Sequence, residues 1–322
     1  MSLLKKNDLI FIAGHNGMVG SSIKRNLLKN GYKNLLTENR QQLDLQNKEQ
    51  VDNWYKKNKP DIVIIAAAKV GGIIANSTYP YEFLLENLKI QNNLIEGAWR
   101  NKVRRLLFLG SSCIYPKFAE QPIVEESLLS GPLEDTNQWY AIAKIAGIKL
   151  CEALTLEYGF DAISLMPTNL YGPGDYYHPE NSHVIPSFIR RFKEASINNL
   201  NEVTCWGSGN PLREFLYVED LSDACRFVLE KWKPQKDEIK FLNVGMGKDI
   251  SIKELAEKIA LKAGYRGIIK WDKSKPDGTP KKQLNIDKIK KLGWKPNTNL
   301  DKGLDQTIEF YESSKERNLL RS

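Results

Sequence analysis

The first half of the chain alternates continuous apolar runs with amphipathic segments, a pattern that few folds accommodate. Strand-like runs occur at DLIFIA, KNLLT, DIVIIAAA, VRRLLFLGS and DAISLMPTN, and the segments between them have helical character. Apolar runs without alternation indicate strands that are buried on both faces, as in a parallel sheet. The sequence therefore predicts an α/β fold with a doubly wound parallel sheet of the Rossmann type.

The composition changes after Asn169, where YGPGDYYHPENSH is rich in Gly, Pro, Asn and aromatic residues. Such a loop marks a boundary. Later elements are expected at a helix from about Ile185, a strand REFLYV, a helix from Glu219, a strand near 240–244 and a helix that Ser251 and Glu254 introduce with a capping box. We expect a larger domain over residues 1–174 plus about 214–248, and a smaller C-terminal α/β lobe over about 175–213 plus 249–322.

Charge and hydropathy narrow the classes of partner. The net charge is +8, but basic residues are scattered among acidic ones, which favours an anionic small substrate and argues against nucleic acid. The longest apolar stretch, residues 62–74, contains Lys69 and is shorter than the ~20 residues of a spanning helix, so no membrane contact is expected. The first strand starts too early to leave room for a signal peptide, which predicts a cytoplasmic protein.

Cysteine and histidine usage predicts neither a disulfide framework nor a metal. The four cysteines show no CxxC spacing, and the three histidines form no HxxxH pair. We therefore expect free thiols and no metal site.

A glycine-rich turn follows the first predicted strand. Gly14, Gly17 and Gly20 form GxxGxxG between a strand and a helix, a context that favours a dinucleotide whose pyrophosphate lies at the helix N-terminus. The alternative is plain turn chemistry. The contacts expected from this end of the chain are Gly14, Gly17, Met18, Val19, Gly20 and Ala67.

Two charged residues end the second strand. An acid here binds the ribose hydroxyls of NAD, whereas an arginine binds the 2′-phosphate of NADP. Glu38 supports the first cofactor and Arg40 the second, and spacing alone does not decide between them. Each could also be a surface charge.

Tyr140 and Lys144 lie four residues apart and so share one face of a helix. A nearby ammonium is expected to lower the pKa of the phenol and make it a usable acid. A hydroxyl at the end of the fourth strand, Ser111 or Ser112, could hold a substrate oxygen. Following a dinucleotide turn, this order indicates a short-chain dehydrogenase/reductase; taken alone, the pair could be a packing tyrosine and a surface lysine.

Several longer motifs resemble those of one family within the short-chain dehydrogenase/reductases. The chain resembles the GDP-L-fucose synthase family, extended short-chain reductases, in the segments AAAKVGGI, LGSSCIYPK, YAIAKIAGIK, MPTNLYGP, HPENSHV, REFL and KPDGTP. The resemblance implies 3,5-epimerisation and then NADPH-dependent 4-reduction of GDP-4-keto-6-deoxy-D-mannose. It also implies a homodimer, formed through the helices near residues 81–100 and 139–158.

The resemblance assigns roles by position. Ser111 and Tyr140 match the groups that bind the C4 oxygen, and Lys144 matches the lysine that holds the nicotinamide ribose. Cys113 and His183 match the epimerisation pair. Both C3 and C5 are α to the ketone, so a base on one face of the sugar and an acid on the other can invert each centre while hydroxyls stabilise the enolate. Without this context, Cys113 would be a buried filler, as we expect for Cys151, Cys205 and Cys225.

Four residues are candidates for further ligand contacts. Arg191 and Arg213 match substrate-contacting arginines, with surface ion pairs as the alternative. Asn169 could bind a ligand or stabilise a turn, and Trp206 could stack on a base or fill the core. Besides Tyr140 and Lys144, Asn169 and His183 complete the expected cofactor contacts.

Two departures from the family pattern bear on the cofactor. Asn16 stands where relatives commonly have arginine, and Glu38 where a neutral or basic residue is common. Arg40 keeps NADP as the prediction, with NAD as the alternative. The competing functions are a GDP-4-keto-sugar reductase without epimerisation, an NAD-dependent 4-epimerase, and a redox-sensing binding protein.

Overall fold

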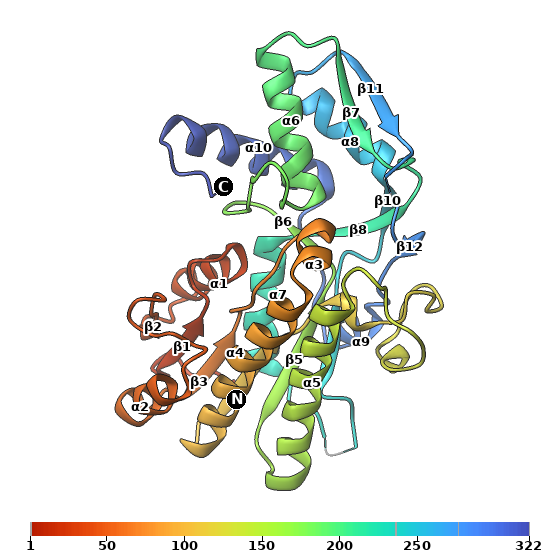
Figure 1. Ribbon diagram of the computed structural model, residues 1–322. Helices are drawn as coiled ribbons and strands as arrows, with labels where there is room; N and C mark the ends of the chain where they lie inside the picture. The colour runs from red at the N-terminus through yellow and green to blue at the C-terminus, as the bar shows by residue number, and fades with distance from the viewer. Residues whose placement is uncertain (1, 236, 276, 322) are drawn as a thin grey trace.

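The computed structural model describes residues 2–235, 237–275 and 277–321, so Pro276 of the KPDGTP motif lies outside them. A six-stranded parallel sheet in the order β2-β1-β3-β4-β5-β9 forms the centre of the larger lobe (Figure 1). Its strands are β1 (Ile10–Ala13), β2 (Leu35–Leu36), β3 (Ile62–Ile65), β4 (Arg105–Leu109), β5 (Ala162–Pro167) and β9 (Phe241–Val244). The predicted α/β fold with a doubly wound parallel sheet is confirmed.

Helices cover both faces of this sheet. The pair α4 and α5 packs on one face beside α2, and the pair α1 and α7 packs together on the other (Figure 1). Their bounds are α1 (Met18–Lys29), α2 (Lys48–Asn58), α4 (Pro80–Arg100), α5 (Gln138–Tyr158) and α7 (Val218–Lys231). The sheet is thus buried on both sides, as the continuous apolar runs required.

The strand order places a ligand site at one edge of the sheet. The chain leaves β1 toward β2 on one side, whereas β3 lies on the other side of β1. Loops that follow β1 and β3 therefore diverge at the carboxyl ends of the strands, where doubly wound sheets bind ligands.

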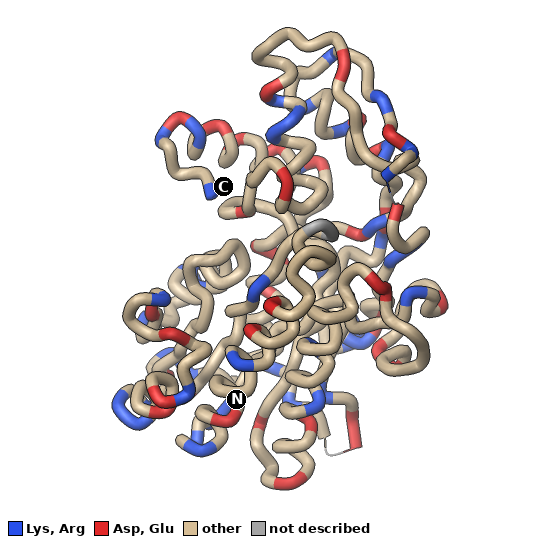
Figure 2. Tube along the Cα trace, viewed as in Figure 1, with Lys and Arg blue, Asp and Glu red and all other residues tan. Residues whose placement is uncertain are grey.

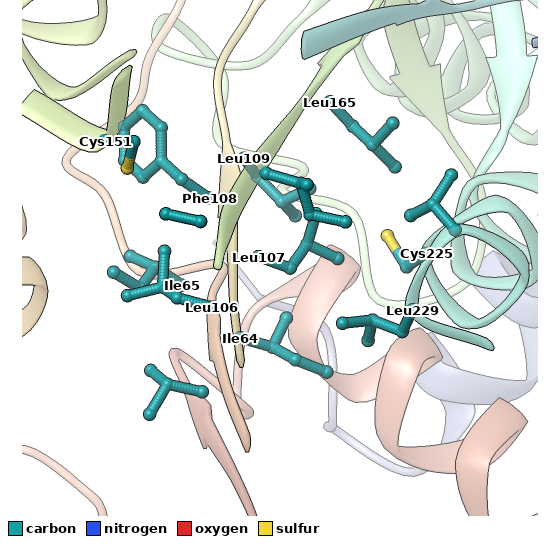
Figure 3. Packing of buried hydrophobic residues seen from close by; sticks show 14 of the residues in the cluster. Ile64, Ile65, Leu106, Leu107, Phe108, Leu109, Cys151, Leu165, Cys225 and Leu229 are labelled. Carbon is teal, nitrogen blue, oxygen red and sulfur yellow. The ribbon is translucent and has the colours of Figure 1, made fainter. Parts of the chain in front are cut away.

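The core of the larger lobe consists of the strand residues predicted from the apolar runs. Ile64, Leu107 and Leu165 are fully buried and pack with Cys225 and Leu229 of α7 (Figure 3). The Cys151 and Cys225 thiols lie in this core and Cys205 lies in the core of the second lobe. The core role expected for these three cysteines is confirmed.

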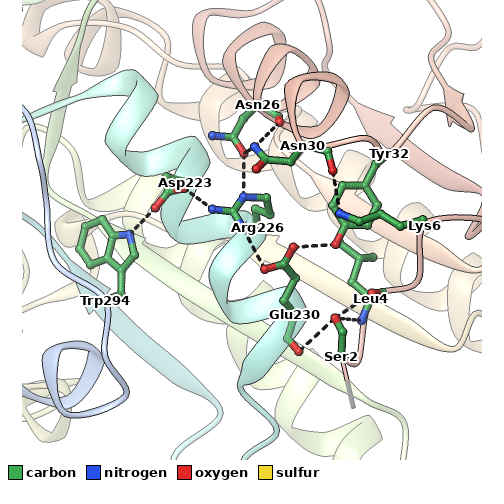
Figure 4. Close-up of polar contacts among 10 residues, drawn as sticks. All are labelled: Ser2, Leu4, Lys6, Asn26, Asn30, Tyr32, Asp223, Arg226, Glu230 and Trp294. Carbon is green, nitrogen blue, oxygen red and sulfur yellow. Dashed lines mark hydrogen bonds and ion pairs between the residues drawn. The ribbon is translucent and has the colours of Figure 1, made fainter.

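A polar network fixes α7 against α1. The Arg226 guanidinium donates to Asn26 Oδ1 at 3.2 Å and forms ion pairs with Asp223 and Glu230 (Figure 4). Glu230 also accepts a hydrogen bond from the Tyr32 hydroxyl at 2.6 Å. A helix from the second half of the chain is thereby joined to the helix that follows the glycine turn.

The second lobe has its own sheets and core. β8 pairs with β6, β10 and β12, and β7 pairs with β11. Its elements are β6 (Asn169–Tyr171), α6 (Val184–Ile197), β7 (Glu202–Trp206), β8 (Leu212–Tyr217), β10 (Asp249–Ser251), α8 (Ile252–Lys262), β11 (Ile268–Asp272), β12 (Lys281–Lys282) and α10 (Leu300–Glu316). The capping box that Ser251 and Glu254 predict at the start of α8 is present.

The chain crosses between the lobes more than once. β8 belongs to the sheet of the second lobe, yet it runs directly into α7, which packs on the larger one. Ile286, Ile289 and Trp294, near α9 (Asp287–Lys291), pack in the larger core. The domain boundaries stay a prediction. The remaining short elements are α3 (Ile73–Thr78), η1 (Ser112–Ile114) and η2 (Glu125–Ser127).

Basic and acidic residues are interspersed along both lobes (Figure 2). Within the described ranges, no helix combines the length and apolarity needed to cross a membrane. The same ranges contain no cluster of three or more His, Cys, Asp or Glu side chains arranged to hold a metal ion.

Candidate active site

The turn after β1 can be built only with glycines at two positions. Gly14 has φ +87°, and a Cβ there would lie 2.6 Å from the backbone nitrogen of Ala67. A Cβ on Gly20 would overlap the Gly14 carbonyl. The loops after β1 and β3 are therefore in backbone contact, at the place where the strand order puts a ligand.

The start of α1 fits the pyrophosphate of a dinucleotide. Gly17 is the N-cap and has no side chain to cap the helix, so among the described residues no N-cap side chain accepts from the amides of the first turn, which begins with Met18 and Val19. The first turn also carries no acidic residue. Free amides and the helix dipole favour an anion here, and the missing Cβ atoms leave space for its close approach.

The charged residues after β2 are held differently from one another. Glu38 Oε1 accepts a hydrogen bond of 3.0 Å from the Trp54 indole, whereas Arg40 is exposed in the next turn. His15 in the glycine turn has a pKa lowered by burial, and its Nδ1 is buried without a partner among the described residues. An acid is therefore fixed near the cofactor turn while the arginine is not.

The next functional segment follows β4. Ser111 caps η1, and its Oγ accepts a hydrogen bond of 3.3 Å from the backbone nitrogen of Cys113. Ser112 is buried, whereas Ser111 and Cys113 are half-buried. Because α5 packs against η1, this turn lies beside Tyr140 and Lys144.

Lys144 is buried at the base of this group. Its Nζ donates to the Leu109 carbonyl at 2.8 Å and lies 5.7 Å from the centroid of the Tyr140 ring. Desolvation lowers the pKa of Lys144 to about 7. The lysine is therefore balanced between its charged and neutral forms near neutral pH.

The expectation that Lys144 lowers the pKa of Tyr140 is wrong for the protein without ligands. Burial, and the negative charge of a Cys113 thiolate, raise the pKa of the phenol above its usual 10. Desolvation outweighs the influence of an ammonium that is itself partly neutral. Tyr140 is thus a protonated phenol at neutral pH, suited to donating a proton.

Cys113 is the one cysteine outside the cores. Asn137, the residue before α5, donates from Nδ2 to Cys113 Sγ at 3.6 Å. Because Asn137 is the N-cap of α5, this bond holds the sulfur at the start of the helix that carries Tyr140 three residues further on. Three predicted catalytic residues, Ser111, Cys113 and Tyr140, are thereby brought together.

His183 comes from the other lobe. It is the N-cap of α6, and the loop before it crosses to the larger lobe, where the Gly72 amide donates to the Asn181 carbonyl at 3.3 Å. The His183 side chain is solvent-accessible, but the protein surrounds it closely enough for desolvation to lower its pKa. Among the hydrogen bonds of the described residues, none joins His183 to Cys113.

The remaining candidates line the second lobe. Asn169 is held by a hydrogen bond of 2.9 Å from its Nδ2 to the Glu214 carbonyl, and Arg191 donates to the Thr204 carbonyl. Arg213 of β8 has a pKa lowered by burial, against the opposing effect of Asp277 and Glu134. These contacts orient each side chain within the lobe.

Trp206 is 52% exposed at the end of β7, so it does not fill the core. The Lys275 ammonium lies 5.5 Å from its ring centroid. Asp277 accepts hydrogen bonds from the backbone and hydroxyl of Ser208, both at 2.7 Å. The sequence prediction named neither Lys275 nor Asp277, although both belong to the KPDGTP motif. It also missed Asn137, whose only signal was its place before a helix.

Comparisons with known proteins agree with this geometry. Residues 10–245 match the NAD dependent epimerase/dehydratase family. The GDP-L-fucose synthase of Escherichia coli is 49% identical over 313 residues, which are 96% of this chain and 98% of that one.

Solved structures give the same result. A GDP-6-OMe-4-keto-L-xylo-heptose reductase from C. jejuni has a TM-score of 0.91 at 33% identity, covering 97% of this chain and 99% of that one. A GDP-L-fucose synthetase from Naegleria fowleri bound to NADP has a TM-score of 0.89 at 25% identity, covering 99% and 98%. This chain belongs to the NAD-dependent epimerase/dehydratase family and, within it, to the GDP-L-fucose synthases.

Proposed function

We propose that this protein converts GDP-4-keto-6-deoxy-D-mannose to GDP-L-fucose by 3,5-epimerisation and NADPH-dependent reduction at C4. The observation that carries the proposal is the grouping of Ser111 and Cys113 of the η1 turn with Tyr140 and the buried Lys144 of α5, which packs against that turn. A reductase needs a proton donor at the reacting oxygen, and an epimerase needs a further group that can take a proton from carbon. This group of side chains offers both.

Tyr140 and Ser111 act on the C4 oxygen in both reactions. Because the pKa of Tyr140 is raised, the phenol stays protonated and donates a hydrogen bond to the ketone. Bound NADPH supplies the hydride that reduces C4. Tyr140 gives its proton to the resulting alkoxide, while Lys144, fixed on the Leu109 carbonyl, orients this face of α5.

Cys113 and His183 exchange the protons at C3 and C5. One of them removes a proton α to the ketone, and the electron pair moves onto the C4 oxygen, which Ser111 and Tyr140 stabilise as an enolate. The other returns a proton to the opposite face of the carbon. The two residues come from different lobes, which suits a pair that acts on opposite faces of one sugar.

The second lobe binds the GDP moiety. Arg191 and Arg213 pair with the phosphates, since guanidinium groups suit bidentate contacts with them. The exposed ring of Trp206, with the Lys275 ammonium on it, offers a stacking surface for the base. Asn169 and His183 approach the nicotinamide end of the cofactor.

A homodimer through α4 and α5 is part of the proposal. Tyr81, Trp139, Ile142, Leu156 and Tyr158 are exposed large side chains on these two helices. Burying them against a second copy would remove apolar surface from water. Light scattering at micromolar concentration tests this, and a monomer there would contradict it. We also place the protein in the cytoplasm, which cell fractionation tests.

The test of function is solvent exchange into the substrate. Purified protein is incubated in D2O with GDP-4-keto-6-deoxy-D-mannose, first without and then with NADPH, while NMR follows deuterium at C3 and C5. We expect deuterium at both carbons, followed by NADPH oxidation and GDP-L-fucose. Cys113→Ser should lose exchange, whereas Cys225→Ala, which alters a thiol in the core, should keep it.

Two other outcomes point elsewhere. NADPH oxidation without exchange at either carbon would identify a 4-keto reductase that lacks epimerase activity. Exchange that persists in Cys113→Ser would remove Cys113 from the proton transfers while leaving the reductase reaction in place.

A further inference from the structure

Asn137 occupies a helix-capping position without capping the helix. It directly precedes α5, and its side chain makes no hydrogen bond to the amides of the first turn. Asparagine is among the preferred N-caps because its oxygen normally accepts such a bond. The side chain of Asn137 is therefore held in another orientation.

In that orientation, the Asn137 side chain contacts Cys113. Asn137 Nδ2 donates to Cys113 Sγ at 3.6 Å, whereas Asn137 Oδ1 is buried without a partner in the described part of the chain. Buried polar atoms are usually paired, so both the missing cap and the unpaired oxygen disfavour this arrangement. The hydrogen bond to Cys113 Sγ is the favourable interaction that offsets these two costs.

The contact favours the charged form of the thiol. An N–H donor binds a thiolate more strongly than a neutral S–H group, because hydrogen bonds to ions are the stronger ones. The N-terminus of α5 adds the positive end of the helix dipole on the same side of the sulfur. Within residues 2–235, 237–275 and 277–321, the bond from Asn137 is the one side-chain hydrogen bond to this sulfur.

The titratable groups around the sulfur do not replace this donor. On α5, Tyr140 is a neutral phenol and Lys144 is directed to the Leu109 carbonyl. In the flanking loops, Lys117 pairs with Asp135 at 3.8 Å. Glu134, also in these loops, accepts a hydrogen bond of 3.1 Å from the amide of Thr136.

We propose that Asn137 is a positioning residue that holds Cys113 Sγ beside the sugar and stabilises its thiolate for proton transfer. The inference rests on the proposed function, in which Cys113 exchanges a proton at C3 or C5. When the thiolate acts as base, an S–H bond forms as the C–H bond breaks, and the electron pair moves to the C4 oxygen. When the thiol acts as acid, its S–H proton goes to the carbon from which the other residue has removed a proton on the opposite face, and Asn137 stabilises the thiolate that remains.

The sharpest variant is Asn137→Asp, which keeps the shape of the side chain but replaces the donor with a carboxylate oxygen. Alkylation of Cys113 by iodoacetamide, followed by mass spectrometry between pH 6 and pH 10 without substrate, reports the thiolate directly. We expect the profile to move to higher pH and the rate at pH 7 to fall by about tenfold, as a shift of one pH unit requires. Gln138→Glu is the matched control, because it adds the same charge next door at a side chain that bonds to the Asp135 carbonyl.

Substrate exchange and cofactor binding complete the test. Asn137→Asp should slow deuterium exchange at C3 or C5 by at least as much as alkylation, while the Kd for NADP+ stays that of the wild type. Asn137→Ala should slow alkylation less, since it removes the donor without adding charge. Its Tm should stay close to that of the wild type because no cap is lost.

The outcomes separate this inference from the proposed function. An Asn137→Asp alkylation profile equal to that of the wild type overturns the inference, whatever Cys113 does. A shifted alkylation profile with unchanged exchange overturns the catalytic link. Loss of exchange in Cys113→Ser tests the proposed function independently, since that variant leaves Asn137 in place.

Discussion

The ammonium nitrogen of Lys144 lies 2.8 Å from the carbonyl oxygen of Leu109, the last residue of β4. The side chain is 3% exposed, and a carbonyl dipole is the one hydrogen-bond acceptor that it has among the described residues. Burial without a carboxylate partner is why its pKa falls to about 7. The protein thus buries a lysine amine, at a cost in desolvation, next to the residues proposed to act on the substrate.

Lys144 should make the stability of the ligand-free protein depend on pH. Because its pKa is about 7 in the folded state and about 10.5 in the unfolded state, the unfolded chain binds more protons between these values. The contribution of Lys144 to the free energy of unfolding therefore rises from pH 7 to pH 9.5. Lys144→Met should be more stable than the wild type at pH 7 and should lose this rise, as measured by urea unfolding.

The matched control is Lys149→Met on the same helix, where the lysine is exposed and pairs with Glu152. It should leave the pH dependence unchanged. An identical pH dependence in Lys144→Met and the wild type would show that the amine is not desolvated.

Replacing Gly14 or Gly31 by alanine distinguishes the effect of steric contact from the effect of backbone strain. Both have positive φ, +87° and +81°, but only at Gly14 would a Cβ meet the backbone of Ala67. Gly31→Ala should cost about 1 kcal/mol, the penalty for a left-handed residue, and leave NADP+ binding intact. Gly14→Ala should cost more and abolish NADP+ binding in calorimetry. Equal effects of the two substitutions would mean that the β1 and β3 loops separate without penalty.

Arg40 and Glu38 should act in opposite directions on cofactor choice. Arg40→Ala should weaken NADP+ binding by about tenfold and leave NAD+ binding unchanged, because only NADP+ has the 2′-phosphate. Glu38→Gln should tighten NADP+ binding, because it removes a negative charge that repels the 2′-phosphate. The Trp54 indole holds this carboxylate near the cofactor turn. Fluorescence titration with each nucleotide measures both effects; if Arg40→Ala weakens both nucleotides alike, Arg40 does not contact the 2′-phosphate.

Asp175 should reduce stability at alkaline pH. Burial raises its pKa to about 7, and its Oδ2 is buried without a partner in the described residues. Because the folded pKa exceeds the unfolded value of 3.8, its contribution to stability falls as pH rises from about 4 to 7. Asp175→Asn should therefore stabilise the protein at pH 8 by ~2 kcal/mol. Thermal unfolding at pH 8 and pH 5 checks this, and a gain that is larger at pH 5 would contradict it.

Local patterns predicted much of the fold because they act through neighbours in the chain. The apolar runs predicted five strands of the large sheet, the strand expected near residues 240–244 is the sixth, and Ser251 with Glu254 predicted the start of α8. The pairing of β7 with β11 was not predictable, because these strands lie more than sixty residues apart and β11 alternates little between buried and exposed residues.

The chemistry of the site depended more on tertiary structure. Motifs made Ser111, Tyr140 and Lys144 candidates, but they did not predict the direction in which burial changes the pKa of Tyr140, since desolvation exists only in the folded chain. Asn137 and Cys113 are 24 residues apart, and their contact depends on how α5 packs against η1. No local sequence pattern predicts how these two elements pack.

The half-buried position of Cys113 also exposes the protein to oxidants. The thiols of Cys151, Cys205 and Cys225 are buried, so peroxide in solution meets Cys113 first. Surroundings that favour a thiolate speed oxidation of a cysteine to a sulfenic acid. If Cys113 exchanges protons as proposed, its oxidation would therefore stop the epimerisation while the groups proposed for the reduction stay unmodified.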